Sequence, residues 1–340
     1  MNKFGRIFSV SIYGESHGKE IGIIIDGCPP GIRIDEDLLL PDLERRKPGK
    51  KGTTPRVESD YPLISSGVFN GMSTGAPILI RFENGNTRSE AYTSQRDIPR
   101  PGHADFTAHV KYKGFEDFRG GGHFSGRLTT GIVAAGVIAK SVLNQILQTE
   151  ISINASILEI GGMHDVEAGL EKAIAQKDTI GGIVECKVAG LPVGLGEPFF
   201  DSAESYIAHA VFAIPAIKGI EFGAGFAAAQ MFGVDHNDAI IDASGKTVTN
   251  HSGGIVGGIT NGNELVFRVV VKPTSSTPKN QTSYNWETKE VEEFSIKGRH
   301  DLCIALRVPV VLESMAALAL ADLAMTYKIN NSSFGVHYSI

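Results

Sequence analysis

The sequence predicts a fold that mixes helices with strands and contains two long apolar helices, the second of them near its centre. Short apolar runs alternate with glycine-rich turns in the first third of the chain, a pattern typical of strands. Residues 127–147 and 308–327 are long stretches of small and apolar side chains, which indicate buried helices. Of the 340 residues, 42% are apolar, so the chain can bury a large core in one big domain or two.

The first elements are indicated by apolar runs and the turns that end them. Residues 21–26, IGIIID, predict a strand that stops at the turn GCPPG. Residues 35–46, DEDLLLPDLERR, carry acids at their start and arginines at their end, as a helix dipole favours. Pro41 predicts a break or a new helix start nearby. Between residues 56 and 84 we expect two or three short strands joined by glycine turns.

The later elements are two helices with few polar residues. From Arg127 to Leu147 small and apolar residues have helical spacing, and the alanines and glycines should let another element approach closely. The last helix, roughly Val308 to Tyr327, is apolar on nearly every face. We therefore expect it to lie centrally.

A faint internal repeat relates two parts of the chain. Each part runs from a strand through a glycine turn to an acidic helix start. The first part is IIIDGCPPGIRIDEDLLLPDLERR, whose turn begins at Gly27, and the second is ECKVAGLPVGLGEPFFDSAESYIAHAV, whose turn begins at Gly190. Chance explains such a match as well as common ancestry does. A real repeat implies one domain, residues 1–340, made of two related halves, roughly 1–160 and 161–340. No Pro- or Ser-rich linker marks a domain boundary.

Composition and missing motifs exclude several classes of protein. The net charge of −6 argues against general nucleic-acid binding. The three cysteines are widely spaced, and the ten histidines form no ligand cluster, so we expect no disulfide framework and no metal. The start lacks a signal-peptide pattern, and no uninterrupted apolar run reaches membrane length, which predicts a soluble, cytoplasmic protein without membrane contact. SGKT at residues 244–247 lacks the first glycine of a P-loop, and no G-x-G-x-x-G unit occurs.

Five short segments carry residues suited to chemistry. YGESHG offers His17 as a proton carrier, and RPGHAD offers Asp105 to orient His103 beside the anion-binding Arg100. RGGGHFSGR, residues 119–127, places three glycines between arginines, which suggests a bound phosphate. The basic loop LERRKPGKKGTTPR, residues 43–56, could close over a polyanion. KPTSS, residues 272–276, offers phosphate ligands. Each of three segments also has a purely structural interpretation. His17 could be a hydrogen-bonded turn histidine, residues 43–56 a solvated basic loop, and KPTSS a plain Ser/Thr turn.

Six motifs together resemble those of the chorismate synthases. They are YGESHG, RPGHAD, FRGGGHFSGR, HSGGIVGG, VKPTSS and KGRHD. The motifs occur in the same order as in the family and with the same spacing between them, and the resemblance extends from Phe4 to about Tyr327. It implies an α+β sandwich with helices between antiparallel sheets and pseudo-twofold halves. It also implies a homotetramer that converts 5-enolpyruvylshikimate 3-phosphate to chorismate by a 1,4-anti elimination. The family requires reduced FMN, although the reaction has no net redox change.

The resemblance also implies roles for individual residues. His17 is similar to the histidine that protonates the departing phosphate, and His103 to the one that supplies a proton near flavin N1. Asp301 matches the aspartate that acts, through flavin N5, as the base for the ring proton. The implied substrate contacts are Ser16, Arg45, Arg46, Arg100, Arg127 and Arg299. The implied FMN contacts are His123, Phe124, Ser125, Pro215, Ala216, Gly257, Lys272, Pro273, Thr274, Ser275, Ser276 and Arg299. Arg46 and Lys51 fall where some members contact NADP.

The chain departs from the family pattern at two places beside the implied flavin site. Many members read GGGRSSAR where this chain reads GGGHFSGR, so His123 replaces an arginine and Phe124 a serine. This exchange could weaken flavin binding or make it depend on pH. The segment PAIKG lacks the asparagine often found before its alanine, leaving Pro215, which offers only its carbonyl. No second nucleotide-binding domain is evident, so we expect a separate reductase to supply reduced FMN.

Two rival interpretations of the same residues remain open. A metal-independent phosphatase or phosphotransferase would use His17 or His300 as nucleophile, leave a phosphohistidine and need no flavin. A flavin- or nucleotide-binding regulator, or an RNA-binding protein that uses the basic loop, would keep its binding after His17→Ala and Asp301→Ala. RNA binding would also depend steeply on salt.

Overall fold

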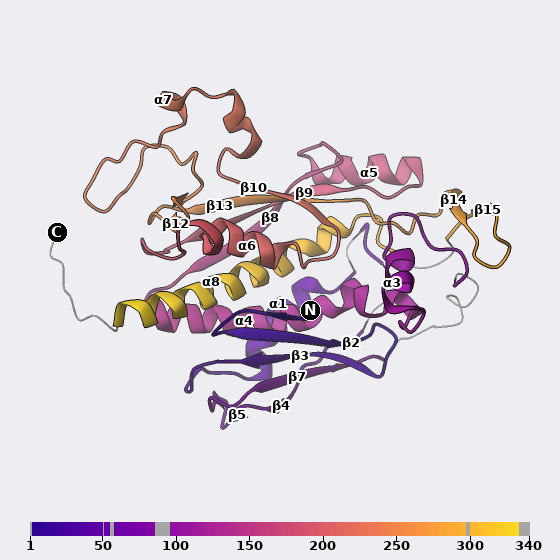
Figure 1. Ribbon diagram of the computed structural model, residues 1–340, viewed down its shortest axis with the longest axis horizontal. Coiled ribbons are helices and arrows are strands. Elements are labelled where there is room, and N and C mark those ends of the chain that lie inside the picture. The colour runs from indigo at the N-terminus through magenta and orange to yellow at the C-terminus, as the bar shows by residue number, and fades with distance from the viewer. Residues whose placement is uncertain (1, 50, 55–57, 86–95, 297–299, 333–340) are drawn as a thin grey trace.

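The computed structural model describes residues 2–49, 51–54, 58–85, 96–296 and 300–332. Two antiparallel sheets enclose a layer of helices, which confirms the expected α+β sandwich (Figure 1). The first sheet has the order β1-β2-β3-β7-β4, and its strands are Lys3–Phe4, Ser9–Gly14, Glu20–Asp26, Ile78–Glu83 and Leu63–Ser66 in that order. The second sheet has the order β10-β13-β9-β8, and its strands are Ile217–Phe222, Leu265–Val271, Gly182–Ala189 and Ser152–Ile160.

Shorter elements surround these sheets. Three hairpins pair β5 (Val68–Phe69) with β6 (Met72–Ser73), β11 (Ile255–Val256) with β12 (Ile259–Thr260), and β14 (Gln281–Tyr284) with β15 (Val291–Phe294). The helices are α1 (Glu36–Arg46), α3 (Asp105–Tyr112), α4 (Thr129–Leu147), α5 (Val166–Gln176), α6 (Ala203–Val211), α7 (Gly233–His236) and α8 (Val308–Ser332). The 3-10 helices are η1 (Arg119–Phe124), η2 (Gly126–Leu128), η3 (Phe199–Asp201), η4 (Gly225–Gln230) and η5 (Ile304–Arg307).

The helices α4 and α8 form the centre of the molecule, and this position was predicted for α8. The helix α4 packs against β2, β3 and β7, whereas α8 packs against β8 and β9, and the two helices also pack on each other. Their contact is close because a Cβ atom at Gly136 would lie only 2.3 Å from the Cβ atom of Ser314. The small residues of α4 therefore serve close helix packing.

Two expectations about local structure were wrong. The helix α1 runs through Pro41 without a break, because only one backbone donor is lost and the helix is fixed elsewhere. Its N-cap, Asp35, accepts a hydrogen bond from the Leu38 amide, and Leu39 and Leu43 are buried in the core. The segment after residue 57 contains four strands, β4 to β7, rather than two or three.

The two parts of the suspected repeat have the same order of elements. In the first, β3 leads through a turn to α1, and in the second β9 leads through a longer turn to α6. Both turns begin with a glycine in the left-handed region, with φ of +76° at Gly27 and +89° at Gly190. The strand β8 pairs with β9 in the second sheet, so the chain changes sheets before residue 160. The division into halves stays a prediction.

Two helical stretches are long and apolar enough to cross a membrane by length and composition. They are Gly126–Leu147 and Ile304–Asn330. Their most apolar windows are 67% and 78% buried inside the protein, in the middle layer of the sandwich. The core accounts for this apolar character.

A buried carboxylate holds the N-terminal segment on α8. Asp322 is fully buried, and its Oδ1 atom accepts hydrogen bonds from the amides of Ile7 (2.7 Å) and Phe8 (2.9 Å). Its Oδ2 atom accepts from the amide of Arg6 (3.1 Å) and from the hydroxyl of Tyr206. One side chain thus accepts hydrogen bonds from three successive backbone amides, of which the Phe8 amide is buried.

Asp322→Asn should lower the free energy of unfolding by about 3 kcal/mol, because an amide nitrogen cannot accept these hydrogen bonds. Chemical denaturation of both proteins measures the difference. Asp201→Asn is the matched control, since Asp201 also pairs with Arg6 (2.9 Å) but is half-exposed, and it should cost less than about 1 kcal/mol. Equal, small losses in the two variants would contradict the role given to Asp322.

Candidate active site

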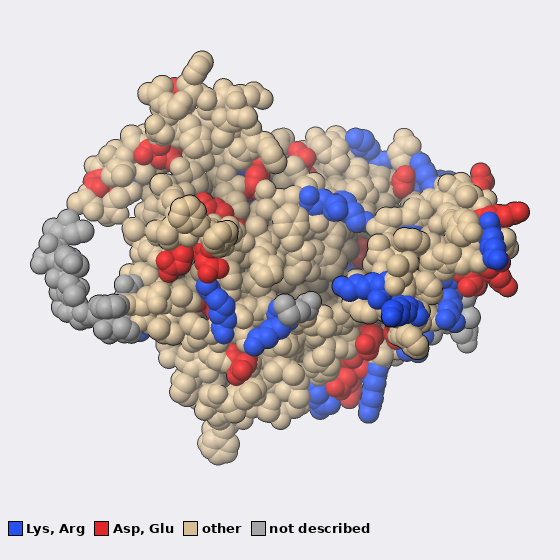
Figure 2. Space-filling view, viewed as in Figure 1, with Lys and Arg blue, Asp and Glu red and all other residues tan. Residues whose placement is uncertain are grey.

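A large cavity lies between the helix layer and the loops at one end of the sandwich. Its volume is about 900 Å³, near the upper end of the range of roughly 300–1,000 Å³ for small-molecule sites. The described lining carries seven lysines and arginines against three carboxylates, and apolar side chains of α4, η5 and α8 complete the wall. Lysines and arginines gather near the central hollow of the face in Figure 2. The cavity therefore suits one or more polyanionic ligands with apolar parts.

The three glycines of η1 provide a surface on which two histidines pack. All three have positive φ, +60° at Gly120, +81° at Gly121 and +51° at Gly122. A Cβ atom at Gly120 would lie 2.3 Å from Cδ2 of His17, and one at Gly121 would lie 3.5 Å from Cε1 of His103. The Gly121 amide donates to the Phe118 carbonyl, so it is not available to an anion. The triplet is thus a close packing surface in addition to any contact it makes with a ligand.

The turn that follows β2 holds Ser16 and His17 behind the glycines. Ser16 is fully buried and His17 is 7% exposed. The Ser16 amide donates to the Gly122 carbonyl (3.0 Å), and Nδ1 of His123 lies 2.7 Å from the Gly14 carbonyl oxygen. Neither Ser16 nor His17 is on the cavity wall, whereas Gly120 is. The ring of His17 therefore packs against the backbone of Gly120, which itself lines the cavity.

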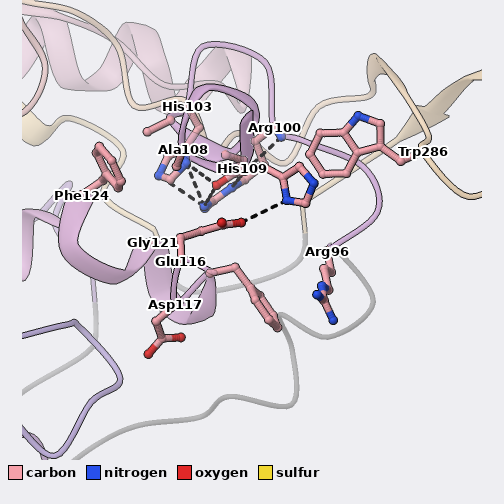
Figure 3. A pocket seen from close by; sticks show the side chains of 13 residues that line it. Arg96, Arg100, His103, Ala108, His109, Glu116, Asp117, Gly121, Phe124 and Trp286 are labelled. Carbon is pink, nitrogen blue, oxygen red and sulfur yellow. Dashed lines mark hydrogen bonds and ion pairs between the residues drawn. The ribbon is translucent and has the colours of Figure 1, made fainter. Parts of the chain in front are cut away.

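His103 lies on the cavity wall in a cluster of charged groups. Its Nδ1 atom is 2.5 Å from Oδ1 of Asp105, and Arg100 grips the same carboxylate with Nε (2.7 Å) and Nη2 (2.8 Å) (Figure 3). Burial opposes ionisation of Asp105, but hydrogen bonds from Arg100 and His103 outweigh it and hold the pKa of Asp105 well below its usual range. Asp105 thus fixes the orientation of the His103 imidazole on the cavity wall.

A second, much smaller pocket supports His103 from behind. It has a volume of about 40 Å³, enough for at least one water, and it shares Arg100, His103 and Phe124 with the large cavity. His109 closes it, with its ring stacked on Trp286 (4.5 Å between centroids) and Nδ1 3.1 Å from Glu116 (Figure 3). Within the described part of the chain, the buried Oε2 atom of Glu116 has no hydrogen-bond partner, which a water in this pocket would supply.

Arg46 and Arg127 lie together on the cavity wall around one buried carboxylate. Nη1 of Arg46 is 3.2 Å from Asp60, and Nη1 of Arg127 donates to the other oxygen of the same side chain. Burial, reinforced by the nearby charge of Arg307, lowers the pKa of Arg46. Asp60 has a left-handed φ of +50°, a strained conformation for a residue with a side chain. Asp60 holds the two guanidinium groups side by side.

Asp301 is held from two sides at the edge of the cavity. Its Oδ1 atom accepts from the Thr54 amide (2.8 Å), and its Oδ2 atom is 3.3 Å from Nη1 of Arg307. The neighbouring His300 also lines the cavity. Burial and then the charge of Arg100 lower the pKa of His300, so its ring is neutral at pH 7. The contacts with Thr54 and Arg307 therefore hold the carboxylate of Asp301 in place on the cavity wall.

The basic loop is attached to the same segment. The Gly52 carbonyl accepts hydrogen bonds from the amides of Leu302 (3.0 Å) and Cys303 (3.1 Å), and the Thr54 amide contacts Asp301. The described end of the loop thus forms part of the structure that holds Asp301.

Most of the residues expected to bind FMN line the large cavity. Lys272 donates from Nζ to Ser275 (2.7 Å) and to the Gly102 carbonyl (3.0 Å), and burial followed by the charge of Lys218 lowers the pKa of Lys272. Ser276 accepts from Nη1 of Arg100 (3.2 Å), which joins the KPTSS segment to the His103 cluster. The expected contacts on this wall are His123, Phe124, Ser125, Pro215, Ala216, Lys272, Pro273, Thr274, Ser275 and Ser276.

Besides Ser16, three expected contacts are not on the cavity wall. Arg45 points away from the cavity and grips Glu313 on α8 with Nη1 (2.7 Å) and Nη2 (2.6 Å). Lys51 pairs with two glutamates of α5 on the exposed surface. Gly257 lies in the turn between β11 and β12 with open space around it. Arg299 lies outside the described residues.

Sequence reasoning missed two residues of the site, Asp60 and Arg307. Asp60 follows the basic loop in RVESD, and Arg307 stands alone in the apolar stretch LCIALRVPVV, where an isolated charge next to a buried helix is a usable signal. Among the described residues, no group of three or more His, Cys, Asp or Glu side chains could hold a metal.

Comparison with known proteins gives a consistent result. A family model described as chorismate synthase matches residues 8–325. A chorismate synthase from Chitinophaga pinensis is 67% identical, over 98% of this chain and 99% of its own length. A chorismate synthase from Archaeoglobus fulgidus is 42% identical, over 95% of this chain and 96% of its own. A crystal structure of chorismate synthase has a TM-score of 0.71 at 25% identity and covers 94% of this chain and 92% of that one.

Proposed function

Because the chain belongs to the chorismate synthase family and is thus a lyase of the shikimate pathway, we propose that it converts 5-enolpyruvylshikimate 3-phosphate to chorismate with reduced FMN. A ring C–H bond and the allylic C–O bond break, a C=C bond forms, and inorganic phosphate leaves, so no net redox change occurs. The observation that carries this proposal is the cationic cavity of about 900 Å³, which has Asp301 and His103 on its wall. The site has room for more than one small ligand.

The residues present fit a flavin mononucleotide. Lys272 and the hydroxyls of KPTSS suit its phosphate, and apolar residues such as Ile214 and Leu318 suit the faces of its ring. His103, held by Asp105, is placed to keep a proton next to that ring. When bound in its reduced form, the flavin supplies electron density to the breaking C–O bond.

The chain's own residues bind and orient the substrate and move its protons. Arg46, Arg100 and Arg127 present fixed positive charge to the anionic groups of the substrate. Asp301 takes up the ring proton, and His17 supplies a proton to the leaving phosphate from behind Gly120. Arg45 has its guanidinium committed to Glu313, so we leave it out of the substrate contacts. Arg299 is kept among the proposed contacts only because it matches the family motif KGRHD.

Flavin dependence separates this proposal from its rivals. Under anaerobic conditions, phosphate should be released from the substrate only when reduced FMN is present, and no phosphohistidine should form. Phosphate release without FMN would favour a phosphatase. We also propose a cytoplasmic homotetramer that receives reduced FMN from a separate reductase. NADPH with oxidised FMN and the pure protein should therefore give no turnover, although Arg46 and Lys51 match NADP contacts of some members.

His123→Arg should preserve turnover within about threefold, because the side chain is a flavin contact and not a proton donor in the reaction. An arginine can still donate to the Gly14 carbonyl, which His123 now contacts at 2.7 Å. Steady-state assays at saturating FMN measure the effect. A loss of more than about 100-fold with an unchanged FMN dissociation constant would show instead that His123 takes part in the chemistry.

A further inference from the structure

The arginines of the cavity differ in how many of their donors the protein already uses. A guanidinium has five N–H groups. Arg46 uses four of them, on Thr129, Asp60 and the carbonyls of Gly126 and Arg127. Arg127 likewise uses four, on Asn84, Asp60, Thr130 and the Glu83 carbonyl. Each of these arginines therefore has little hydrogen-bonding capacity left for a ligand.

Arg307 has more capacity left. It donates from Nε to the Arg46 carbonyl (3.2 Å) and from Nη1 to Asp301 (3.3 Å). Its other three N–H groups have no hydrogen-bond partner within the described ranges of the chain. The side chain lines the large cavity and is 20% exposed. An arginine with a free edge in a cavity can bind a carboxylate or phosphate with two parallel hydrogen bonds.

The anchors of Arg307 fix the direction of that free edge. The Arg46 carbonyl is at the C-terminus of α1, where a cation is favoured by the helix dipole. Arg307 itself ends η5, directly before the buried helix α8. Since Nε and Nη1 are already held by the Arg46 carbonyl and by Asp301, the guanidinium loses little additional freedom when it binds a ligand.

We propose that Arg307 is a further substrate-binding residue, which holds an anionic group of the substrate on its remaining N–H groups and Asp301 on Nη1. The inference rests on the proposed function and extends it, because one guanidinium then sets the distance between the substrate and the base. The group held is a carboxylate or the phosphate, which present the same pair of oxygens to an arginine.

Binding can be measured without turnover by loading the protein with oxidised FMN and titrating 5-enolpyruvylshikimate 3-phosphate by calorimetry. Arg307→Gln should weaken this binding by about 10- to 100-fold, since hydrogen bonds between charged groups are lost. Arg307→Lys, which keeps the charge but not the fork, should bind with intermediate affinity. Arg33→Gln is the matched control, because Arg33 is 71% exposed and pairs only with Asp35. It should bind like wild type.

A parallel titration with inorganic phosphate identifies the group. If the affinity for phosphate falls as much as that for the substrate, Arg307 holds the phosphate. If only substrate affinity falls, it holds a carboxylate. Unchanged substrate affinity in a folded Arg307→Gln protein would overturn the inference. Turnover by the wild-type protein separates failure of this inference from failure of the proposed function. A wild-type protein that makes no chorismate contradicts the proposed function itself.

Discussion

Asp301→Asn lowers the turnover number by about 10²- to 10⁴-fold on this account, the range expected for loss of a general base. Asparagine has nearly the same shape and can still accept the hydrogen bond from the Thr54 amide, which is 2.8 Å from Oδ1. It cannot take up a proton. Substrate affinity should therefore change much less than turnover. Anaerobic steady-state kinetics with reduced FMN separate kcat from KM.

The control for this variant is Asp242→Asn, the same chemical change on the exposed surface far from the cavity. It should turn over like wild type. The two variants should also unfold at similar temperatures, which excludes a general loss of structure. Turnover of Asp301→Asn within a few-fold of wild type would show that another group accepts the ring proton.

Gly120→Ala should reduce turnover by roughly 100-fold, because misplacing a reacting group by about 1 Å has effects of this size. A methyl group at this position would lie 2.3 Å from Cδ2 and 2.5 Å from Nε2 of His17. The ring must then move away from the cavity. The measurement is kcat at saturating substrate and FMN.

Gly162→Ala is the matched control for the backbone cost of this change. Gly162 also has a positive φ, +80°, but open space surrounds the position of its Cβ atom. Both variants therefore carry left-handed strain of about 1–2 kcal/mol, and only Gly120→Ala also displaces a histidine. Equal turnover in the two variants would mean that His17 has no part in the reaction.

Local sequence patterns predicted much of the fold. The strand at residues 21–26 and the helices at 127–147 and 308–327 follow from apolar runs whose length and spacing leave little choice. The continuation of α1 through Pro41 could not be predicted from the sequence, because the cap at Asp35 and the buried leucines compensate for the hydrogen bond that proline loses. Local propensity does not report such tertiary compensation.

The site could be predicted from the sequence only where its residues lie close together in one motif. RPGHAD places Arg100, His103 and Asp105 within one turn, and the structure brings these three side chains together. Asp60 joins the site through Arg46 and Arg127, and Arg307 through the Arg46 carbonyl, and these contacts link residues that are distant in the sequence. Arg45 was expected in the site but lies outside it. Its neighbour Arg46 faces the cavity, and the rotation between successive residues of the helix directs Arg45 to Glu313 instead.

The glycine triplet has gained a second role through the structure. As a sequence, RGGGHFSGR suggested a phosphate cradle. In the folded protein the glycines let His17 and His103 approach a shared backbone, while Arg127 lies beside Asp60 on the cavity wall. The absence of side chains at Gly120 and Gly121 leaves room for the rings of these two histidines.

The central claim is that this cavity converts 5-enolpyruvylshikimate 3-phosphate to chorismate with the help of a flavin. Its most direct test is to measure chorismate and inorganic phosphate in the same anaerobic reaction. With reduced FMN, we expect equal amounts of the two products and no consumption of the flavin. Phosphate released without an equal amount of chorismate, or the same turnover in the absence of FMN, would contradict it.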